Sequence, residues 1–553
     1  GSNGWGRYNQ PYNMLNNSGY TKTWNAFIQS KVTLDQKLNF ITDGLSIKGT
    51  ISFDADFTST MKRSKTPKTY NALRRDENGA LVKKVMKEGS PLGDPWKEGT
   101  SGSKKIYMEA SLNYQHTFAQ KHDVTGLLLY MQKETQYQDK EGVQLLPYRK
   151  QSMVGRATYG YDDRYMFEAS VGITGSENFA SGHRWGMFPA VGVAWFVSHE
   201  KFMRGIEDYI NKLKIRASVG VTGNDNIGYD TRFPYRGSIN TRASGYNFGL
   251  TPGANGGASN WLDGIVEGTF NAPNLSWEKE RKINVGADFG FFRGRVDISF
   301  DYFSNRRDNI LIQRETLPSA TGFRSKPFQN FGVTTNKGVD ASIILKQNIG
   351  EVSLSARGNI TYAKNKIVER DEIPQPYPWL LETGNAIGQP KLYIAEGLYT
   401  PDDFDIQTDP ANGAQKFILK DHLPKPSANV SPGDIKYKDL NNDHVIDSYD
   451  MTYKNGYYPS LPEIVYGFGL NAEWKGFFVG VFFQGVAHTS TNMISNITNI
   501  VPFTIGRDNT SARTEVLNRW RADDPYNQDV FFPRMHSSEY THNTSNSTWW
   551  YRD

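Results

Sequence analysis

The chain contains no cysteine and no long apolar run. Without cysteine it has no disulfides and no metal or catalytic site built on a thiolate. Its richest apolar segment, Phe477–Ala487, is interrupted by Gly480 and Gln484, whereas a membrane-spanning helix needs about 20 consecutive apolar residues. The sequence therefore excludes a helical membrane protein.

The chain also lacks a strong charge excess and any catalytic motif. Its formal charge is +5, from 63 basic and 58 acidic residues, which gives no support for nucleic-acid binding. It contains no G-x-S-x-G, HExxH or P-loop pattern, and we interpret the acidic pairs Asp402-Asp403 and Asp523-Asp524 as solvated loop charges rather than glycosidase dyads. We do not expect an enzyme. The opening residues GSNGWGRYNQ do not form a signal peptide, so we expect the chain to begin after processing or within a longer protein.

Apolar and polar residues alternate along many segments. In residues 45–57 every odd position is apolar or glycine and every even position is polar, and 106–115 and 351–362 alternate in the same way. Because successive side chains of a strand point to opposite faces, each segment has one apolar and one polar face. Long two-faced strands are typical of a transmembrane β-barrel, with the apolar face toward lipid and the polar face toward a lumen.

The links between these segments alternate in length. The short links are Asp43-Gly44, 119–123, Asp162-Asp163, 292–294, 348–350 and Lys475-Gly476, and the long links lie at about 58–103, 137–148, 223–276, 314–331, 366–462 and from 490 onward. Outer-membrane barrels likewise have short periplasmic turns and longer extracellular loops. The link 198–212 is longer than its periplasmic position suggests, and we expect Leu392–Thr400 to pair inside the 366–462 loop.

These boundaries predict an all-β fold, a transmembrane antiparallel β-barrel wall of about 14 strands. The strands are expected near 26–42, 45–57, 104–118, 124–136, 149–161, 164–176, 185–197, 213–222, 277–291, 295–313, 332–347, 351–365, 463–474 and 478–489. The last residues, Thr548–Asp553, follow a loop and provide no final strand. Because an open sheet edge in hydrocarbon leaves costly unpaired backbone groups, we expect residues 1–553 to be part of a larger barrel.

Seven motifs carry a resemblance to a known family. In chain order they are Gly155–Tyr159, Asp163–Ser170, Arg184–Ala190 with Trp195, His199–Met203, Leu213–Asn224, Asn274–Lys279, and Asn330–Gly332 with Asn336–Asp340. Together they resemble the SusC/RagA-type TonB-dependent outer-membrane transporters over essentially the whole chain. Ala190 departs from the family, which more often has serine there.

The resemblance implies a barrel of about 22 strands filled by an N-terminal plug. About eight strands, the plug and the TonB-contacting segment would then lie outside residues 1–553, which form a partial TonB-dependent receptor barrel domain. The implied function is TonB-dependent import of oligosaccharides or peptides across the outer membrane of a Gram-negative, Bacteroidota-like bacterium. The implied partners are a SusD-like surface lipoprotein, which covers the barrel mouth as a lid, and TonB.

Two other classes of function are compatible with parts of the pattern. A passive porin or a structural assembly scaffold would use the same fold without energy from TonB, and a plug with a TonB-interacting segment upstream of Gly1 would argue against it. A secreted, soluble, β-rich carbohydrate-binding protein or lyase would dissolve without detergent, whereas a lipid-facing apolar stripe predicts aggregation.

One loop motif has the spacing of a calcium site. Oxygen ligands would come from Asp439, Asn441, Asp443, the Val445 carbonyl, Asp447 and Asp450, which are positions 1, 3, 5, 7, 9 and 12 of an EF-hand-like loop. His444 occupies the position where the tight turn favours glycine, and histidine adopts left-handed backbone more often than most residues. We expect a structural calcium ion that stiffens the large 366–462 extracellular loop region. The alternative is a surface turn held by Asx hydrogen bonds.

The strands and loops supply two further sets of candidates. The loop tryptophans Trp96, Trp261, Trp379, Trp549 and Trp550 either stack on a ligand or pack within the loops. The alternation places Lys48, Asp54, Glu109, Arg216, Asp297 and Arg357 toward the lumen, and Ile47, Ile51, Phe53, Val296, Ile298, Phe300, Val352, Leu354 and Ile360 toward lipid.

Overall fold

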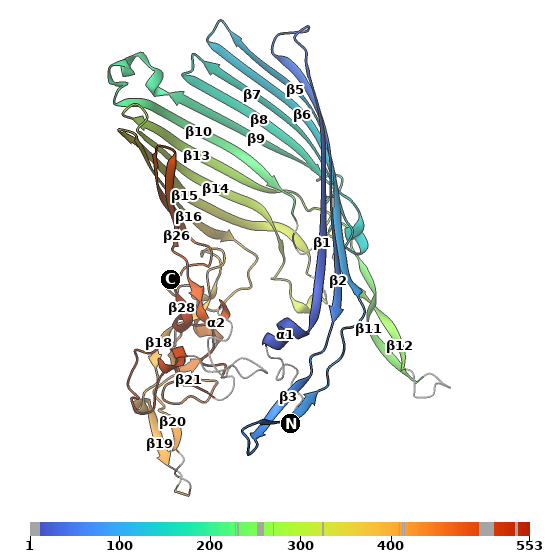
Figure 1. The fold of residues 1–553 in the computed structure, drawn as a ribbon, viewed down its shortest axis with the longest axis vertical. Helices are drawn as coiled ribbons and strands as arrows, with labels where there is room; N and C mark the ends of the chain where they lie inside the picture. Colours follow the sequence, from blue (N-terminus) through green and yellow to red (C-terminus); the bar gives the residue numbers. More distant parts are fainter. Residues whose placement is uncertain are drawn as a thin grey trace.

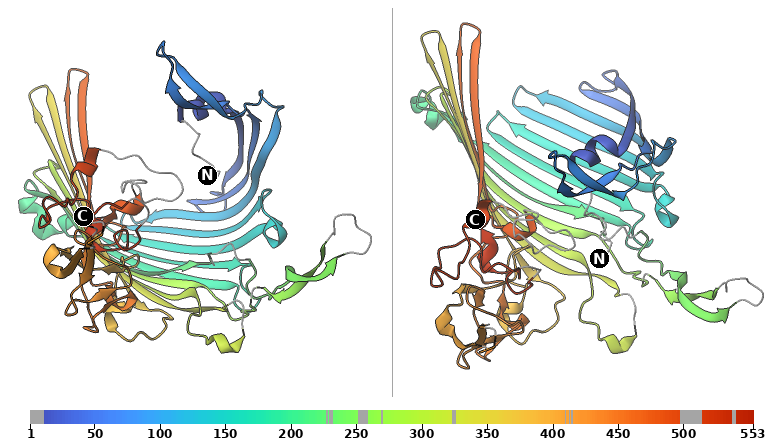
Figure 2. Two further views of the ribbon diagram at one scale, coloured as in Figure 1. Left: turned by 90° about the horizontal axis from the view of Figure 1, so that it is seen from below. Right: turned by 60° about the horizontal axis from the view of Figure 1, so that its bottom comes forward.

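One curved antiparallel sheet of fourteen strands dominates the protein, and its strands follow one another in chain order from β1 to β26 (Figure 1). The computed structural model describes residues 11–226, 228, 232–250, 259–268, 270–322, 326–408, 410–411, 413, 415–496, 514–536 and 540–553. Viewed along the wall, the strands form an arc around a concave side (Figure 2). The predicted all-β wall of about 14 strands is confirmed.

Most wall strands lie close to the predicted segments, but residues 58–64 and 96–103, which the sequence predicts as loop, continue two of the strands. The wall strands are β1 (Gly19–Lys37), β2 (Leu45–Ser64), β5 (Trp96–Phe118), β6 (His122–Tyr137), β7 (Tyr148–Tyr161), β8 (Tyr165–Ser176), β9 (Trp185–Phe196), β10 (Ile210–Asn224), β13 (Glu278–Phe291), β14 (Val296–Gln313), β15 (Phe328–Ile349), β16 (Val352–Glu369), β25 (Ile464–Trp474) and β26 (Phe477–Ala487). The 198–212 link contains two short 3-10 helices, Val197–His199 and Lys201–Ile206. These helices account for its unusual length.

The first wall strand differs from its prediction. The sequence predicts a strand near 26–42, whereas β1 ends at Lys37 and residues 38–44 form a turn. In that turn the backbone N–H groups of Ile41 and Thr42 donate to the Leu38 carbonyl, which removes them from the ladder. At its other end β1 begins early because β2 continues to Ser64, which pairs with Gly19.

The short turns have the backbone that tight hairpins require. Asp162 and Asp163 both have φ of 53°, and Lys475 and Gly476 have φ of 48° and 87°. Positive φ at both central residues is the property of type I′ turns, whose twist matches that of the flanking strands. These turns therefore hold successive wall strands directly side by side.

The wall is apolar on one face and polar on the other. The strand register places all nine predicted lipid-facing residues on the same face. On that face Ile51 is 57% exposed and Leu470 is 63% exposed, whereas Thr50 and Ser111 on the opposite face are each 5% exposed. Exposed apolar and buried polar residues are the reverse of a water-soluble sheet, and they fit a wall whose apolar face contacts lipid.

The long connections gather at one end of the wall (Figure 1). Apart from short 3-10 helices, the helices and strands outside the wall are α1 (Pro11–Asn17), which precedes β1, and β3 (Thr69–Arg75), β4 (Leu81–Lys87), β11 (Ile239–Leu250), β12 (Ser259–Glu267), β17 (Leu392–Tyr393), β18 (Ala395–Leu398), β19 (Phe404–Thr408), β20 (Gln415–Leu419), β21 (Lys425–Pro426), β22 (Ile435–Tyr437), β23 (Val445–Ile446), β24 (Met451–Thr452), β27 (Thr491–Asn492), α2 (Met493–Asn496) and β28 (Tyr551–Arg552). As predicted, residues 392–400 pair inside their own loop, where β17 joins β24 and β18 joins β22. None of the described helices has the length and apolar content that a membrane crossing requires.

The loops, not the wall, contain the main apolar core. Leu398, Ile435 and Tyr437 from the loop between β16 and β25 pack with Phe532 and Trp550 near the C-terminus. The largest fully buried side chains of the described chain all lie outside the fourteen wall strands. The loop segments 370–463 and 514–553 therefore pack together as one structured unit.

Candidate functional site

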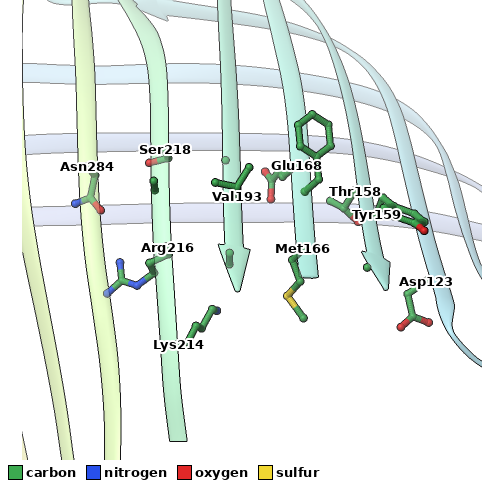
Figure 3. A pocket seen from close by; sticks show the side chains of 15 residues that line it. Asp123, Thr158, Tyr159, Met166, Glu168, Val193, Lys214, Arg216, Ser218 and Asn284 are labelled. Carbon is green, nitrogen blue, oxygen red and sulfur yellow. The ribbon is translucent and has the colours of Figure 1, made fainter. Parts of the chain in front are cut away.

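The polar face of the wall forms a hollow of about 430 Å³ on β6–β10 and β13 (Figure 3). The register aligns Thr158, Glu168, Gly192, Ser218 and Asn284 in one row across five strands. This hollow presents hydroxyl, amide and carboxylate groups, with small residues and the apolar side chain of Met166 between them. It can therefore contact a polar solute or the polar surface of another protein segment.

Arg216 is the centre of a charge network on this face. Its guanidinium donates to both carboxylate oxygens of Asp301 at 2.6 and 2.7 Å, and it lies 3.3 Å from Asp288. Ser299 donates to Asp288 at 2.7 Å. The nearby pair Arg156–Glu168 is 2.8 Å long. These side chains are fixed by one another, so the arrangement suits a rigid polar lining rather than proton transfer.

Arg232 contacts and holds together three chain segments at the long-loop end of the wall. It is 7% exposed, and its guanidinium donates to the carbonyls of Val143, Leu146 and Pro147 and pairs with Glu177. The guanidinium also lies over the ring of Tyr148, 3.9 Å from its centre. Because one buried guanidinium binds groups from all three segments, it determines the relative positions of the chain around 143–148, the end of β8 and the loop after β10.

A second buried charge joins the 366–462 loop to the C-terminal segment. Asp434 is fully buried, and its carboxylate accepts from His536 Nε2 and Asn543 Nδ2, both at 2.9 Å, and from the Ser431 backbone at 2.8 Å. Tyr437 extends the junction by donating to the His542 carbonyl at 2.6 Å. Residues about 100 positions apart are thus held in one polar cluster.

Asp371 ties the loop after β14 to the loop after β16. Its carboxylate accepts from the Glu315 and Thr316 backbone N–H groups at 2.6 and 3.1 Å and lies 2.9 Å from Arg314 Nε. Burial opposes ionisation of this carboxyl, but the hydrogen bonds from Arg314, Thr316 and Glu315 outweigh it and lower its pKa to about 2.

We predict that Asp371→Asn weakens this junction by about 2 kcal/mol, because a pKa shift of one unit corresponds to about 1.4 kcal/mol. Since the folded-state pKa lies below the ordinary value of 3.8, the contribution is complete above that pH and is lost as pH falls toward about 2. Hydrogen exchange of residues 314–322 measures the effect. Glu369→Gln, which removes an exposed carboxylate from the same loop base, should leave exchange unchanged. Equal effects of both substitutions would contradict the junction.

The predicted calcium loop is held by hydrogen bonds between side chains and backbone. Asp439 accepts from the N–H groups of Asn442 and His444 at 2.7 and 2.9 Å, and Asp443 accepts from Val445 at 2.9 Å. As expected, His444 adopts left-handed backbone, with φ of 62°.

The last two carboxylates of this loop also accept from backbone. Asp447 accepts from Tyr449 at 2.7 Å, and Asp450 accepts from Leu440 and Asp447 at 2.8 and 2.9 Å. Burial raises the pKa of Asp450, with smaller contributions from the nearby carboxylates of Asp439 and Asp447. Within the described ranges, no group of three or more histidine, aspartate or glutamate side chains is arranged to hold a metal ion. Calcium binding by Asp439, Asn441, Asp443, Val445, Asp447 and Asp450 stays a prediction.

The five tryptophans that the sequence assigns to loops fall into two groups, and one of them, Trp96, is the first residue of wall strand β5. Trp550 is 1% exposed in the loop core, Trp549 donates to the Phe531 carbonyl, and Trp379 stacks on Tyr377 with ring centres 4.6 Å apart. Trp96 and Trp261 are 49% and 54% exposed. The first group therefore packs within the loops, and only Trp96 and Trp261 remain open to a ligand.

Sequence reasoning placed Arg216 on the polar face but missed its two carboxylate partners, and it missed Arg232, Asp371 and Asp434 entirely. The partners of Arg216 lie 72 and 85 positions away, so only the strand register reveals them. Arg232 stands in the run Arg-Phe-Pro-Tyr, an arginine among aromatic residues, which was a usable signal for a packed cation.

A family model described as "TonB dependent receptor-like, beta-barrel" matches residues 1–505. TonB-dependent receptor P39 of Formosa agariphila is 27% identical over 425 residues, which cover 68% of this chain and 38% of that protein. TonB-dependent receptor SusC of Bacteroides thetaiotaomicron is 31% identical over 219 residues, which cover 39% of this chain and 21% of that protein. The chain thus spans less than two fifths of the length of these curated relatives.

Solved structures give the same fold. The RagAB peptide transporter superimposes with a TM-score of 0.62 at 19% identity, over 97% of this chain and 55% of that chain. The RagAB peptide importer in the open-open state gives a TM-score of 0.62 at 20% identity, over 96% of this chain and 54% of that chain.

Proposed function

Because the chain belongs to the TonB-dependent receptor-like β-barrel family, an outer-membrane family, we propose that the protein imports oligosaccharides or peptides across the outer membrane as the SusC-like barrel of a SusCD-type complex. The observation that carries this proposal is the two-faced wall, with a polar concave face below an end of long, structured loops. A large polar solute can enter past the loops and move along a polar surface without meeting lipid.

The direct test compares uptake by cells from which the gene is deleted with uptake by the same cells after the gene is restored on a plasmid. Labelled oligosaccharides and labelled peptides too large for porins are supplied separately, and import of one class should depend on both the gene and TonB. The passive-porin alternative predicts uptake that depends on the gene and continues without TonB. Absence of gene-dependent uptake for both classes would contradict the import proposal.

The names of the relatives do not decide between the two cargo classes. The RagAB structures are named for peptide import, whereas the names of SusC and of receptor P39 state no cargo, so both cargo classes enter the uptake test. The exposed rings of Trp96 and Trp261 suit stacking on sugar rings, a feature that favours a glycan. Trp96→Ala should then reduce glycan uptake more than peptide uptake.

We further propose that a SusD-like surface lipoprotein covers the long-loop end. The core formed by residues 370–463 and 514–553 supports this proposal, because a structured loop unit presents a fixed surface for docking. Gentle detergent extraction of tagged protein from native membranes should recover a lipoprotein of this type in stoichiometric amount. Recovery of an intact barrel alone would count against the lid.

The calcium loop forms a separate proposal with its own test. Calcium should stabilise residues 439–450 by about 3 kcal/mol at a concentration one hundred times its dissociation constant. Proteolysis of the 366–462 loop, with calcium or with a chelator, measures this protection. Asp439→Asn should abolish the difference, whereas Asp421→Asn, which changes an exposed carboxylate in the same loop, should preserve it. Equal proteolysis with calcium and chelator in the unmodified protein would leave the Asx-turn alternative.

A further inference from the structure

A cluster of lysines lies on the apolar, outward face of the wall, beyond the last tyrosines of β14–β16. The register sets Tyr302, Val339 and Tyr362 in one row across these strands. The next row toward the loops contains Ser304, Lys337 and Lys364, and the row after that contains Arg306, Thr335 and Lys366. The outward face therefore changes, within two rows, from aromatic to cationic.

The height of this cluster follows from strand geometry. From Val352 to Tyr362 the outward face of β16 spans ten residues, or about 34 Å along a strand that rises about 3.4 Å per residue. A tilt of about 35–45° converts this length to about 24–28 Å, the height of the apolar band of an outer-membrane barrel. Tyr362 thus marks the outer edge of the hydrocarbon, and Lys364 and Lys366 lie at the level of lipid headgroups.

The lysines border a cavity of about 770 Å³ between the wall and two loop segments. Segments 384–389 and 453–458 form its loop side, which adds Lys454 and the rings of Tyr453, Tyr457 and Tyr458. The single acidic residue of the lining is Glu463, which is 5% exposed and already contacts His488 at 3.3 Å. The cavity is therefore strongly cationic, with tyrosine hydroxyls and rings around it.

The lysines repel one another within the protein. Lys337 and Lys364 are directly opposite on adjacent strands, an arrangement that is destabilising for like charges. In the part of the chain that the structure describes, Lys337, Lys364, Lys366 and Lys454 make no ion pair, whereas Arg306 in the same region contacts Asp308 at 2.8 Å. An anion from outside the chain would relieve this repulsion.

We propose that Lys337, Lys364 and Lys366 bind the phosphate groups of a glycolipid headgroup in the outer leaflet. The cluster faces away from the lumen and directly adjoins the apolar band, so the ligand it meets first is a lipid. Tyr302 and Tyr362 lie below the lysines, where rings contact both acyl chains and headgroup sugars. The bound lipid also reaches the loop segments 384–389 and 453–458, and it thereby fixes the loop unit to the membrane surface.

The test compares lipid binding by two triple variants of the intact protein. The first, K337Q/K364Q/K366Q, removes the cluster. The second, K83Q/K84Q/K87Q, removes three charges from the β3–β4 hairpin on the same side of the membrane. The proteins are reconstituted in nanodiscs and titrated with bisphosphorylated lipid A or with the same lipid after phosphatase treatment. Inorganic phosphate serves as competitor.

The unmodified protein and the hairpin variant should bind phosphorylated lipid A, and the cluster variant should bind about 10–100-fold more weakly. Dephosphorylated lipid should bind the unmodified protein and both triple variants equally. The variant K337R/K364R/K366R should bind phosphorylated lipid A like the unmodified protein, which would exclude misfolding as the cause of weaker binding. Inorganic phosphate should compete only at far higher concentration, because it lacks the acyl chains. Equal lipid binding by both triple variants would overturn the proposal. It would also be overturned if the cluster variant kept lipid binding but lost a protein that co-purifies with the unmodified chain, because that result would identify a protein interface.

Discussion

Replacing Ile343 with arginine should lower the stability of the barrel by roughly 2–4 kcal/mol, the cost of a cation at the lipid-facing midplane. Ile343 lies on the outward face of β15, opposite Gly358 and therefore close to the middle of the Val352–Tyr362 band. An arginine there cannot reach water without distorting the bilayer. Urea unfolding of the intact protein in lipid bilayers measures the change.

The adjacent residue provides a matched control. Ser342 points to the polar face, opposite Ser299 and Asn359. Ser342→Arg introduces the same charge one position away, and it should change stability by less than about 1 kcal/mol because the side chain enters a polar lining. If the two variants lost the same stability, the assignment of faces would be wrong.

Replacing Arg232 with methionine should release the loops that this side chain joins. Removing one partner of a buried ion pair typically costs about 3–5 kcal/mol, and three backbone carbonyls would also lose their donor. We expect the wall to stay intact, because Arg232 lies outside every wall strand. Faster hydrogen exchange at residues 143–148 and 232–238, with unchanged exchange in β7 and β8, is the expected signature.

Arg236 gives the comparison for this experiment. It is exposed and lies 6.0 and 5.9 Å from the ring centres of Phe233 and Tyr235. Arg236→Met removes the same charge four positions later and should leave exchange nearly unchanged. Arg232→Lys should recover only part of the protection, since an ammonium cannot serve several acceptors through a planar fork. Similar hydrogen exchange in the Arg232→Met and Arg236→Met variants would show that Arg232 does not hold these loops together.

The wall could be predicted because the interactions that determine it are between residues close together in the sequence. A lipid-facing strand must alternate, and tight hairpin turns such as Asp162-Asp163 and Lys475-Gly476 must interrupt that alternation. Both signals are contained in a few consecutive residues. The error at β1 has the same origin: Leu38 and Phe40 continue the apolar pattern past Lys37, but backbone hydrogen bonds to Leu38 turn the chain before the alternation ends.

The structure of the loop end could not be predicted, because it depends on contacts between residues far apart in the sequence. Asp434 and His536 show no periodicity, and their contact depends on packing between segments about 100 residues apart. The loop core behaves in the same way, since Trp550 looks like a candidate ligand contact in the sequence but is buried against Phe532. For residues 439–450 the sequence left two alternatives, and the backbone at His444 is compatible with both.

The central claim is that alternate residues of this sheet face lipid and lumen, and spin labels along one strand measure it most directly. The chain has no cysteine, so each single-cysteine variant adds one attachment point within it. Nitroxides at positions 352–357 and 359–361 of β16 in the bilayer-reconstituted protein are relaxed by oxygen, which concentrates in hydrocarbon, and by a water-soluble nickel chelate. Oxygen accessibility should peak at Val352, Leu354, Ala356 and Ile360 and fall at Ser353, Ser355, Arg357 and Asn359, with a period of two. A flat profile, or peaks at the odd-numbered residues, would contradict the account.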